Sequence, residues 1–150
     1  MSDPIVATVE LRRGQGGDVD ALVSFWAEAG ENHHRPADGV ALVESLLSRD
    51  PDSLVIAELD GRIVGTVIAG WDGWRAHLYR LAVAPELRGR GIARLLVRHA
   101  EARLAELGAI RFDAMVLADN ATGAAAWSAM GYRPQDEWAR WIKSASPDAR

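Results

Sequence analysis

The sequence predicts an α+β fold, a three-layer sandwich in which helices pack on a mostly antiparallel sheet. Short segments of alternating or continuous apolar residues predict the strands. Asp60-Gly61 joins two of these segments and supplies the positive φ angles of a type I′ hairpin turn. One long amphipathic segment, residues 91–107, separates two further strands and provides a single crossover connection. One crossover among hairpins is typical of an α+β sandwich.

The first third of the chain is expected to hold one strand and two helices. Residues 5–12 alternate loosely and end at a glycine cluster, which predicts the strand. Asp18 is then a candidate N-cap for a helix over 18–30, whose apolar residues repeat at helical spacing. A second helix is expected over 37–48 for the same reason, and the turn Asp50-Pro51-Asp52 ends it.

The middle of the chain is expected to be two consecutive hairpins. Residues 54–59 and 62–69 flank the Asp60-Gly61 turn. A second turn at 71–74 leads into a strand over 75–83. The remaining expected elements are the helix 91–107, which ends before Gly108, a strand over 109–117, a helix over 120–130 and a last strand over 136–142.

Length and composition predict one globular domain over residues 1–150, with a tail that frays from about residue 144. A chain of 150 residues with 49% hydrophobic content can bury a sizeable core. No segment approaches the ~20 apolar residues needed to cross a bilayer, and residues 1–4 lack the basic start of a secretory signal. We therefore expect a cytoplasmic protein without a membrane partner. Because there is no cysteine, disulfides, thiolate metal sites and a cysteine nucleophile are excluded.

Charge is distributed unevenly along the chain. Residues 1–60 hold twelve acidic side chains and four arginines, whereas residues 75–111 hold eight arginines and three glutamates. This division would steer anionic ligands to one side and cationic ligands to the other, but ordinary surface charge explains it equally well. No basic stripe interleaved with aromatic residues occurs, so a nucleic-acid partner is not expected.

Residues 83–94 have the pattern of an anion-binding loop. An apolar strand ends at Pro85, and the chain then passes through Gly89 and Gly91 into a helix. A glycine turn at a helix start directs free backbone N–H groups and the positive end of the helix dipole at one point, which suits a pyrophosphate. A P-loop would need Gly-Lys-Ser/Thr, and a dinucleotide fingerprint would need glycine where Arg94 stands, so both of these alternatives fit poorly.

Arg88, Gly91 and Ala93, together with the strand before them and the helix after them, resemble the cofactor loop of the GNAT superfamily of acetyl-CoA-dependent N-acetyltransferases. A second similarity is Asn120, which opens a helix that ends at Gly131-Tyr132. The resemblance covers roughly residues 54–143. It implies a mixed sheet of six to seven strands flanked by about four helices, with strands four and five splayed around the pantetheine arm. It also implies acetyl-CoA as cosubstrate, no metal, and a possible homodimer.

The resemblance also assigns residues to the cofactor. Backbone groups near the end of strand four would polarise the thioester carbonyl, and the helix-opening asparagine would contact the cofactor arm in addition to capping its helix. The cofactor-binding residues implied in this way are Leu81, Ala82, Val83, Arg88, Gly89, Arg90, Gly91, Ile92, Ala93, Arg94, Asn120 and Trp127.

A general base is sought on strand four, where alternation places His77, Tyr79, Leu81 and Val83 on one face. The family often places its base six residues before the strand-ending valine, which is His77 here. A neutral imidazole suits proton removal near neutral pH, either directly or through water. The alternative is a histidine that only packs at a hairpin end.

The expected general acid is missing. The family supplies a tyrosine seven residues after the asparagine, and here that residue is Trp127, whose indole N–H donates a hydrogen bond but does not transfer a proton. Tyr79 and Tyr132 are possible substitutes, although Tyr132 stands at a packing position. A thiolate with a pKa of about 8.5 leaves tolerably without an acid. Trp127 or water is therefore expected to stabilise it.

These observations predict a GNAT-type N-acetyltransferase that moves acetyl to a primary amine by direct attack on the thioester. The alternative is a catalytically weak acetyl-CoA-binding sensor or scaffold. A protein N-terminus or lysine is an alternative to a small-molecule acceptor. The adjacent His33 and His34 do not converge on one point of a helix, so no metal site is expected. The identity of the acceptor is not encoded in any motif.

Overall fold

The computed structural model describes residues 3–146 of the chain, which fall into two compact units. The first, the sheet unit, holds residues 3–32 and 38–115. The second, the C-terminal unit, holds residues 33–37 and 116–146. Each unit is described by itself.

The sheet unit contains a five-stranded mixed sheet. Its strands lie in chain order: β1 (Glu10–Arg13), β2 (Leu54–Leu59), β3 (Arg62–Trp71), β4 (Ala76–Val83) and β5 (Phe112–Ala114). The first four are antiparallel neighbours, and β5 runs parallel to β4. The connection between β4 and β5 is the long helix α4 (Ile92–Glu106), as the single crossover in the sequence predicts. The α+β sandwich and the mixed sheet are confirmed.

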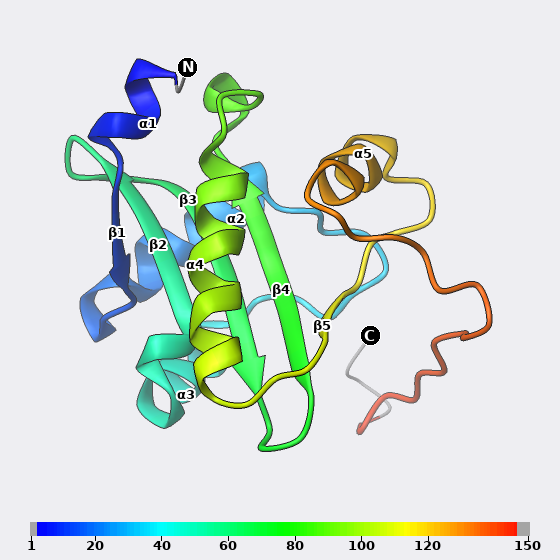
Figure 1. Ribbon diagram of the computed structural model, residues 1–150. Helices are drawn as coiled ribbons and strands as arrows, with labels where there is room; N and C mark the ends of the chain where they lie inside the picture. The colour runs from blue at the N-terminus through cyan, green and yellow to red at the C-terminus, as the bar shows by residue number, and fades with distance from the viewer. Residues whose placement is uncertain (1–2, 147–150) are drawn as a thin grey trace. The chain divides into compact units, whose positions relative to one another are not determined.

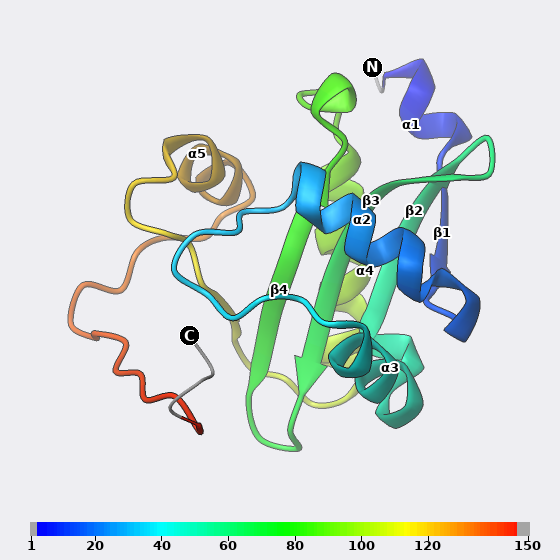
Figure 2. The ribbon, with the colours of Figure 1, turned by 180° about the vertical axis from the view of Figure 1, so that it is seen from behind.

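Helices cover both faces of this sheet. Figure 1 shows α4 in front of β2, β3 and β4, and Figure 2 shows α2 (Val19–Ala29) and α3 (Val40–Arg49) on the opposite face. We call these the α4 face and the α2–α3 face. On the α4 face, a Cβ on Gly65 would lie 2.9 Å from Leu96 Cδ1, so this glycine allows α4 to pack directly on β3.

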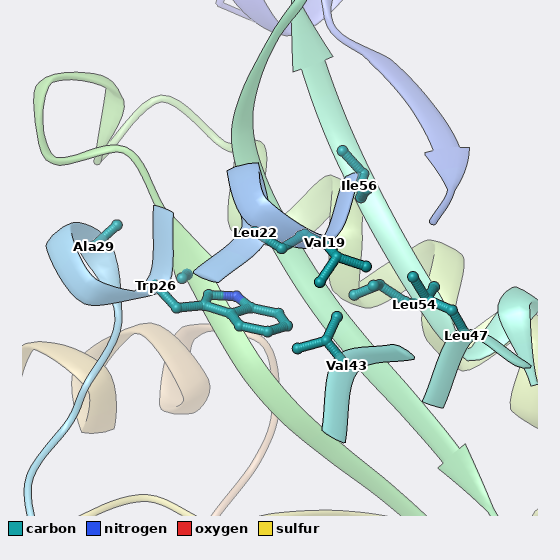
Figure 3. Close-up of a cluster of buried hydrophobic side chains, with 9 residues drawn as sticks. Val19, Leu22, Trp26, Ala29, Val43, Leu47, Leu54 and Ile56 are labelled. Carbon is teal, nitrogen blue, oxygen red and sulfur yellow. The ribbon is translucent and has the colours of Figure 1, made fainter. Parts of the chain in front are cut away.

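The main hydrophobic cluster lies on the α2–α3 face (Figure 3). Its members, from α2, α3, β2 and β4, are Val19, Leu22, Trp26, Ala29, Val43, Leu47, Leu54, Ile56 and Ala82. Trp26 is the largest of them and is only 2% exposed. Burial of these side chains fixes α2 against the sheet beside β4.

The N-terminal segment differs from the prediction. The strand expected over 5–12 is instead a short helix, α1 (Pro4–Thr8), followed by a shorter strand that starts at Glu10. Asp3 Oδ1 accepts a hydrogen bond of 2.9 Å from the Ile5 backbone N–H, and Pro4 fixes the φ angle of the first helical residue. The Asp3 cap and Pro4 together favour a helix more strongly than the loose alternation of residues 5–12 favours a strand.

The end of the chain also differs. The strand expected over 109–117 is only Phe112–Ala114, and no strand forms at 136–142 in the part of the chain that the structure describes. The sheet therefore has five strands rather than six to seven. Trp138 and Trp141 in this segment are 76% and 94% exposed. A strand needs a neighbouring strand to pair with its backbone, and an apolar pattern alone does not supply one. The predicted frayed tail lies partly outside the described residues.

The C-terminal unit contains one α-helix among its described residues, α5 (Ala121–Ala129), close to the predicted 120–130. The other predicted helices also form, within about three residues of their expected ends. With α1, the described chain has five α-helices where about four were expected.

Candidate active site

β4 is paired on both sides only in its first half. Its register with β5 comprises Ala76 with Phe112, His77 with Asp113 and Leu78 with Ala114, and pairing with β5 stops there. The edge of β4 that faces away from β3 continues to Val83 beyond the last of these pairs. Backbone groups on such an edge can bind an extended ligand as a further strand would. The resemblance implied a parting of strands four and five at this place.

The second half of β4 contains a β-bulge. The register with β3 shifts between Thr66, opposite Ala82, and Ile68, opposite Tyr79. Within the bulge Arg80 has a φ angle of +48°, in the left-handed region that a non-glycine residue rarely adopts. The bulge adds a residue to β4 and turns its backbone locally.

The bulge changes which side chains share a face, and the predicted alternation is wrong beyond Tyr79. Val83 pairs with Gly65, which faces α4, so Val83 lies on the α4 face. Tyr79 pairs with Ile68, which packs on the cluster of the α2–α3 face. His77 shares this face with Tyr79, but Val83 does not, because alternation holds only in an unbroken strand.

A buried hydrogen-bond chain holds the bulge in place. Trp26 Nε1 donates to Thr66 Oγ1 at 2.9 Å, and this hydroxyl donates to the Arg80 carbonyl oxygen at 2.9 Å. Thr66 is fully buried, and Trp26 and Arg80 nearly so. The hydroxyl satisfies one donor and one acceptor that would otherwise be buried without partners.

The Arg80 side chain crosses to the segment that follows α2. It donates to the Glu31 carbonyl oxygen and to Asn32 Oδ1, each at 3.0 Å, and forms an ion pair with Asp38. The sequence interpretation missed this residue. A signal was available in the sequence, because Arg80 stands two residues after the buried Leu78, at a position where strand alternation predicts burial. A buried arginine requires partners, so its presence there could have indicated an ion pair.

The loop before α4 contains two glycines with positive φ angles. Gly89 and Gly91 have φ angles of +76° and +100°, which glycine adopts without strain. Gly91 is the N-cap of α4, and it has no side chain to accept from the first-turn N–H groups. The start of this 15-residue helix therefore fits a phosphate group.

The arginines of the loop have different roles. Arg88 Nε donates to the Val83 carbonyl oxygen at 3.1 Å and its Nη2 donates to the Ala29 carbonyl oxygen at 3.0 Å. Arg88 thus braces the loop against β4 and α2. Arg90 lies 3.7 Å from the Asp3 carboxylate, and Arg94 lies on the exposed side of the first turn of α4.

The other loop residues start the helix. Ile92 is 1% exposed, and its Cγ2 lies 3.2 Å from a Cβ built on Gly65, so it anchors α4 to the sheet. Ala93 is half-buried. Any contact of these two residues with a phosphate would come from the backbone.

His77 and Tyr79 lie together on the α2–α3 face. Their ring centroids are 5.9 Å apart, and His77 is half-buried. Tyr79 is exposed, and its Cε2 lies 3.3 Å from a Cβ built on Gly70, so the glycine makes room for the phenol ring. Tyr79 is thus 39% exposed beside the half-buried imidazole.

Two carboxylates lie near His77. Hydrogen bonds from the Arg111 guanidinium, at 2.6 and 2.9 Å, lower the pKa of Asp113, and a weaker contribution comes from His77. The backbone N–H groups of Arg75 and Trp74 lower the pKa of Asp72. Both carboxylates are therefore ionised at neutral pH.

The remaining predicted residues lie in the C-terminal unit. Asn120 is the N-cap of α5, as predicted, and its Oδ1 accepts from the Gly123 N–H at 2.9 Å. Trp127 is 8% exposed and packs edge to face on Tyr132 with ring centroids 4.7 Å apart. Tyr132 is half-buried and packs against Trp127 within this unit.

A cavity of about 430 Å³ lies elsewhere in the sheet unit, between α2 and the β2–β3 hairpin. Arg12 lines it and is already paired with Asp18 at 2.8 Å and Glu58 at 2.9 Å. Within residues 3–146, no three histidine or acidic side chains cluster as metal ligands would, and no helix is long and apolar enough to cross a membrane.

Comparison with known proteins agrees with this geometry. The acetyltransferase (GNAT) family matches residues 19–132, a span that includes the bulge, the loop and α5. A protein named acetyltransferase from Pectobacterium atrosepticum is 36% identical over 113 residues, which cover 75% of this chain and 79% of that protein. The match identifies an acyltransferase, and the chain belongs to the GNAT acetyltransferase family. It is an N-acetyltransferase.

Solved structures share the fold at lower identity. AAC(6')-Iy, in complex with the bisubstrate analogue CoA-S-monomethyl-acetylneamine, has a TM-score of 0.72 at 19% identity, covering 91% of this chain and 99% of that chain. A protein described as a predicted acetyltransferase from Clostridium acetobutylicum, solved with acetyl-CoA, has a TM-score of 0.70 at 18% identity, covering 89% of this chain and 96% of that chain. At these identities the likeness concerns the fold.

Proposed function

We propose that this protein transfers an acetyl group from acetyl-CoA to a primary amine by direct attack on the thioester, without a metal ion. The single observation that carries the proposal is that β4 outruns its partner β5 and leads directly into an uncapped glycine loop at the start of α4. A strand edge followed by a helix N-terminus suits a ligand with an amide-containing arm and a pyrophosphate. Solved structures of the same fold contain CoA compounds.

The loop residues would hold the pyrophosphate. Gly89, Gly91 and the first residues of α4 offer backbone N–H groups, and Arg90 and Arg94 add positive charge. Arg88 would act mainly by fixing the loop, since its guanidinium binds two carbonyl oxygens. Leu81, Ala82 and Val83 would contribute backbone groups to the pantetheine arm and to the thioester carbonyl.

His77 is proposed as the general base, acting directly or through water, with Tyr79 beside it. The amine nitrogen forms a bond to the acetyl carbon, the carbon–sulfur bond breaks, and the amine proton passes to His77. The sulfur leaves as the thiolate of CoA, stabilised by the Trp127 N–H or by water. Asp72, an ionised carboxylate near His77, would favour the approach of a cationic amine, whereas Asp113 is already paired with Arg111.

The acceptor is proposed only by class, as a small-molecule amine, a protein N-terminus or a lysine. The acidic character of residues 1–60 supports a cationic acceptor. We further propose a single catalytic domain, because the family match covers residues 19–132. A cytoplasmic location is part of the same proposal. A homodimer is compatible with this proposal.

A second function remains a candidate on one specific observation. Trp127 stands where a proton donor was expected, and it is largely buried against Tyr132. A chain that binds acetyl-CoA but turns it over weakly would act as a sensor or scaffold.

Thermal unfolding with acetyl-CoA, CoA and ATP tests the cofactor assignment. A ligand at ~100 times its dissociation constant should stabilise the fold by about 2.7 kcal/mol, a shift of several degrees. A shift with both CoA compounds but not with ATP supports the proposal. No shift at saturating acetyl-CoA would refute it.

Release of CoA in the presence of a panel of amines then separates the enzyme from the sensor. His77→Ala should lower turnover most between pH 6 and 8, because the alanine variant has no group to accept the amine proton. Near-wild-type turnover of this variant from pH 6 to 9 would show that His77 is not the base. Trp127→Tyr should keep or raise activity, and a severe loss with intact CoA binding would count against the role given to Trp127.

A further inference from the structure

Arg80 connects three parts of the sheet unit. Its backbone forms the bulge of β4, at a φ angle of +48°, and its carbonyl oxygen accepts from Thr66. Its guanidinium reaches both ends of the segment between α2 and α3, at Glu31 and Asn32 on one side and Asp38 on the other. The side chain is only 4% exposed. A buried arginine with this set of partners is a rigid link between backbone elements.

The link ends beside the proposed catalytic face. Tyr79 precedes Arg80 directly, and it shares the α2–α3 face with His77, two residues further back. The Arg80 side chain and its partners therefore lie on the face of β4 that His77 and Tyr79 share. The cofactor loop is braced separately, by Arg88, which bonds to Val83 and Ala29.

We infer that Arg80 is a positioning residue that sets the affinity for the amine acceptor, by locking both ends of the α2–α3 segment onto the β4 bulge. This inference rests on the proposed function and deepens it. We call Arg80 with its partners Glu31, Asn32 and Asp38 the Arg80 clamp. The inference assigns acceptor binding to this clamp and cofactor binding to the loop that Arg88 braces. The acceptor segment and the cofactor loop are thus braced by separate arginines, each of which also bonds to the chain near the end of α2.

The chain has made room for this clamp. A Cβ on Gly30, at the end of α2, would lie 2.5 Å from Arg80 Nη1 and 2.8 Å from the Trp26 carbonyl oxygen. Gly30 has an ordinary φ angle of −85°, so its value here is space and not backbone freedom. The guanidinium also lies 5.6 Å from the centroid of the Trp26 ring, the same residue whose indole begins the hydrogen-bond chain to the bulge.

Substitutions can separate the backbone role of Arg80 from its side-chain role. Arg80→Gly keeps a residue that accepts a positive φ angle, so the bulge is retained while the guanidinium is lost. Asp38→Asn removes the charge of the partner without touching β4. Arg80→Lys keeps a positive charge but loses the planar, multi-partner geometry.

The matched control is a second arginine clamp in the same unit. Arg103 donates to the Ala69 carbonyl oxygen at 2.6 Å and to both oxygens of Asp50 at 2.8 Å. Arg103→Lys and Asp50→Asn remove a comparable clamp that touches neither the bulge nor the α2–α3 segment. These two variants show how much the loss of an arginine–aspartate pair elsewhere in the unit changes the KM values of the two substrates.

Steady-state kinetics in both substrates, with an amine that the wild-type protein acetylates, provide the test. Arg80→Gly and Asp38→Asn should raise the acceptor KM by about tenfold or more, as expected when a buried charge pair is broken. The KM for acetyl-CoA and its thermal shift should stay within about twofold of wild type. Arg80→Lys should fall between wild type and Arg80→Gly, and the Arg103 and Asp50 controls should leave the acceptor KM unchanged.

Hydrogen exchange gives a readout that does not depend on turnover. Amides of residues 31–38 should exchange faster in Arg80→Gly and Asp38→Asn than in the two controls. An unchanged acceptor KM in both variants, or an equal rise in the KM for acetyl-CoA, would overturn the inference while leaving the proposed function intact. If wild-type protein binds CoA but acetylates no amine, the proposed function fails, and this inference fails with it.

Discussion

The two halves of β4 differ in regularity although they belong to one strand. From Ala76 to Leu78 the strand has a neighbour on each side and its side chains alternate without interruption. From Tyr79 to Val83 it has left β5, it contains a bulge, and a non-glycine residue has a positive φ angle. The candidate cofactor-binding backbone groups of Leu81 to Val83 lie in the irregular half, whereas the candidate base His77 lies in the regular half. In a regularly paired strand the backbone N–H and C=O groups bond to neighbouring strands. Where the pairing is interrupted, these groups can bind a substrate instead.

Truncation of a core side chain in each half should give the largest contrast. Leu78 is 2% exposed on the regular half, so Leu78→Ala should cost about 2–5 kcal/mol of unfolding free energy. Leu81 is half-buried beside the bulge, so Leu81→Ala should lower the unfolding free energy clearly less than Leu78→Ala does. Urea denaturation of both variants measures the difference. Equal losses would mean that the irregular half is packed as firmly as the regular one.

Removal of the Thr66 hydroxyl should break the bulge itself. In Thr66→Val the Trp26 N–H loses its acceptor and the Arg80 carbonyl oxygen loses its donor, in a fully buried place. We expect a loss of about 2 kcal/mol, together with faster amide exchange around residues 80–83. Thr66→Ser, which retains the hydroxyl, is the matched control. A stable Thr66→Val variant with unchanged exchange would show that the bulge does not depend on this hydrogen bond.

The regular parts of the fold followed from local patterns in the sequence. The Asp60-Gly61 hairpin, the helices near 18–30 and 91–107 and the glycine loop between β4 and α4 were predictable, because each depends on turn chemistry or periodicity within a short window. The irregular half of β4 was not. Its bulge depends on Thr66 and Trp26, which are 14 and 54 residues away from Arg80 in the sequence.

Errors at the two ends of the chain have a similar origin. At the N-terminus a weak strand pattern competes with a helix-start signal, the N-cap Asp3 followed by Pro4, and the helix forms. This signal could have been recognised in the sequence. At residues 136–142 the pattern of a strand is present, but a strand also needs a neighbour, which periodicity does not specify. For the candidate site, the loop glycines could be predicted, while the Arg80 clamp required knowledge of which residues meet across the sheet.

The smallest expected effect concerns the link between β4 and β5 in the regular half. Asp113 lies opposite His77 in the register, and its hydrogen bonds from Arg111 hold its pKa below the ordinary value of about 3.9. A carboxyl group with a lowered folded-state pKa stabilises the fold fully above its unfolded pKa, and this contribution is lost as the pH falls through the folded value. Asp113→Asn should therefore lower Tm slightly at pH 7, and the difference from wild type should shrink below about pH 4. It should also shrink in high salt, because the side chains of Arg111 and Asp113 are 59% and 32% exposed. A difference that stays constant from pH 7 to pH 2 would assign the loss to packing of β5 instead of charge, and the regular half would then owe its order to β-pairing alone.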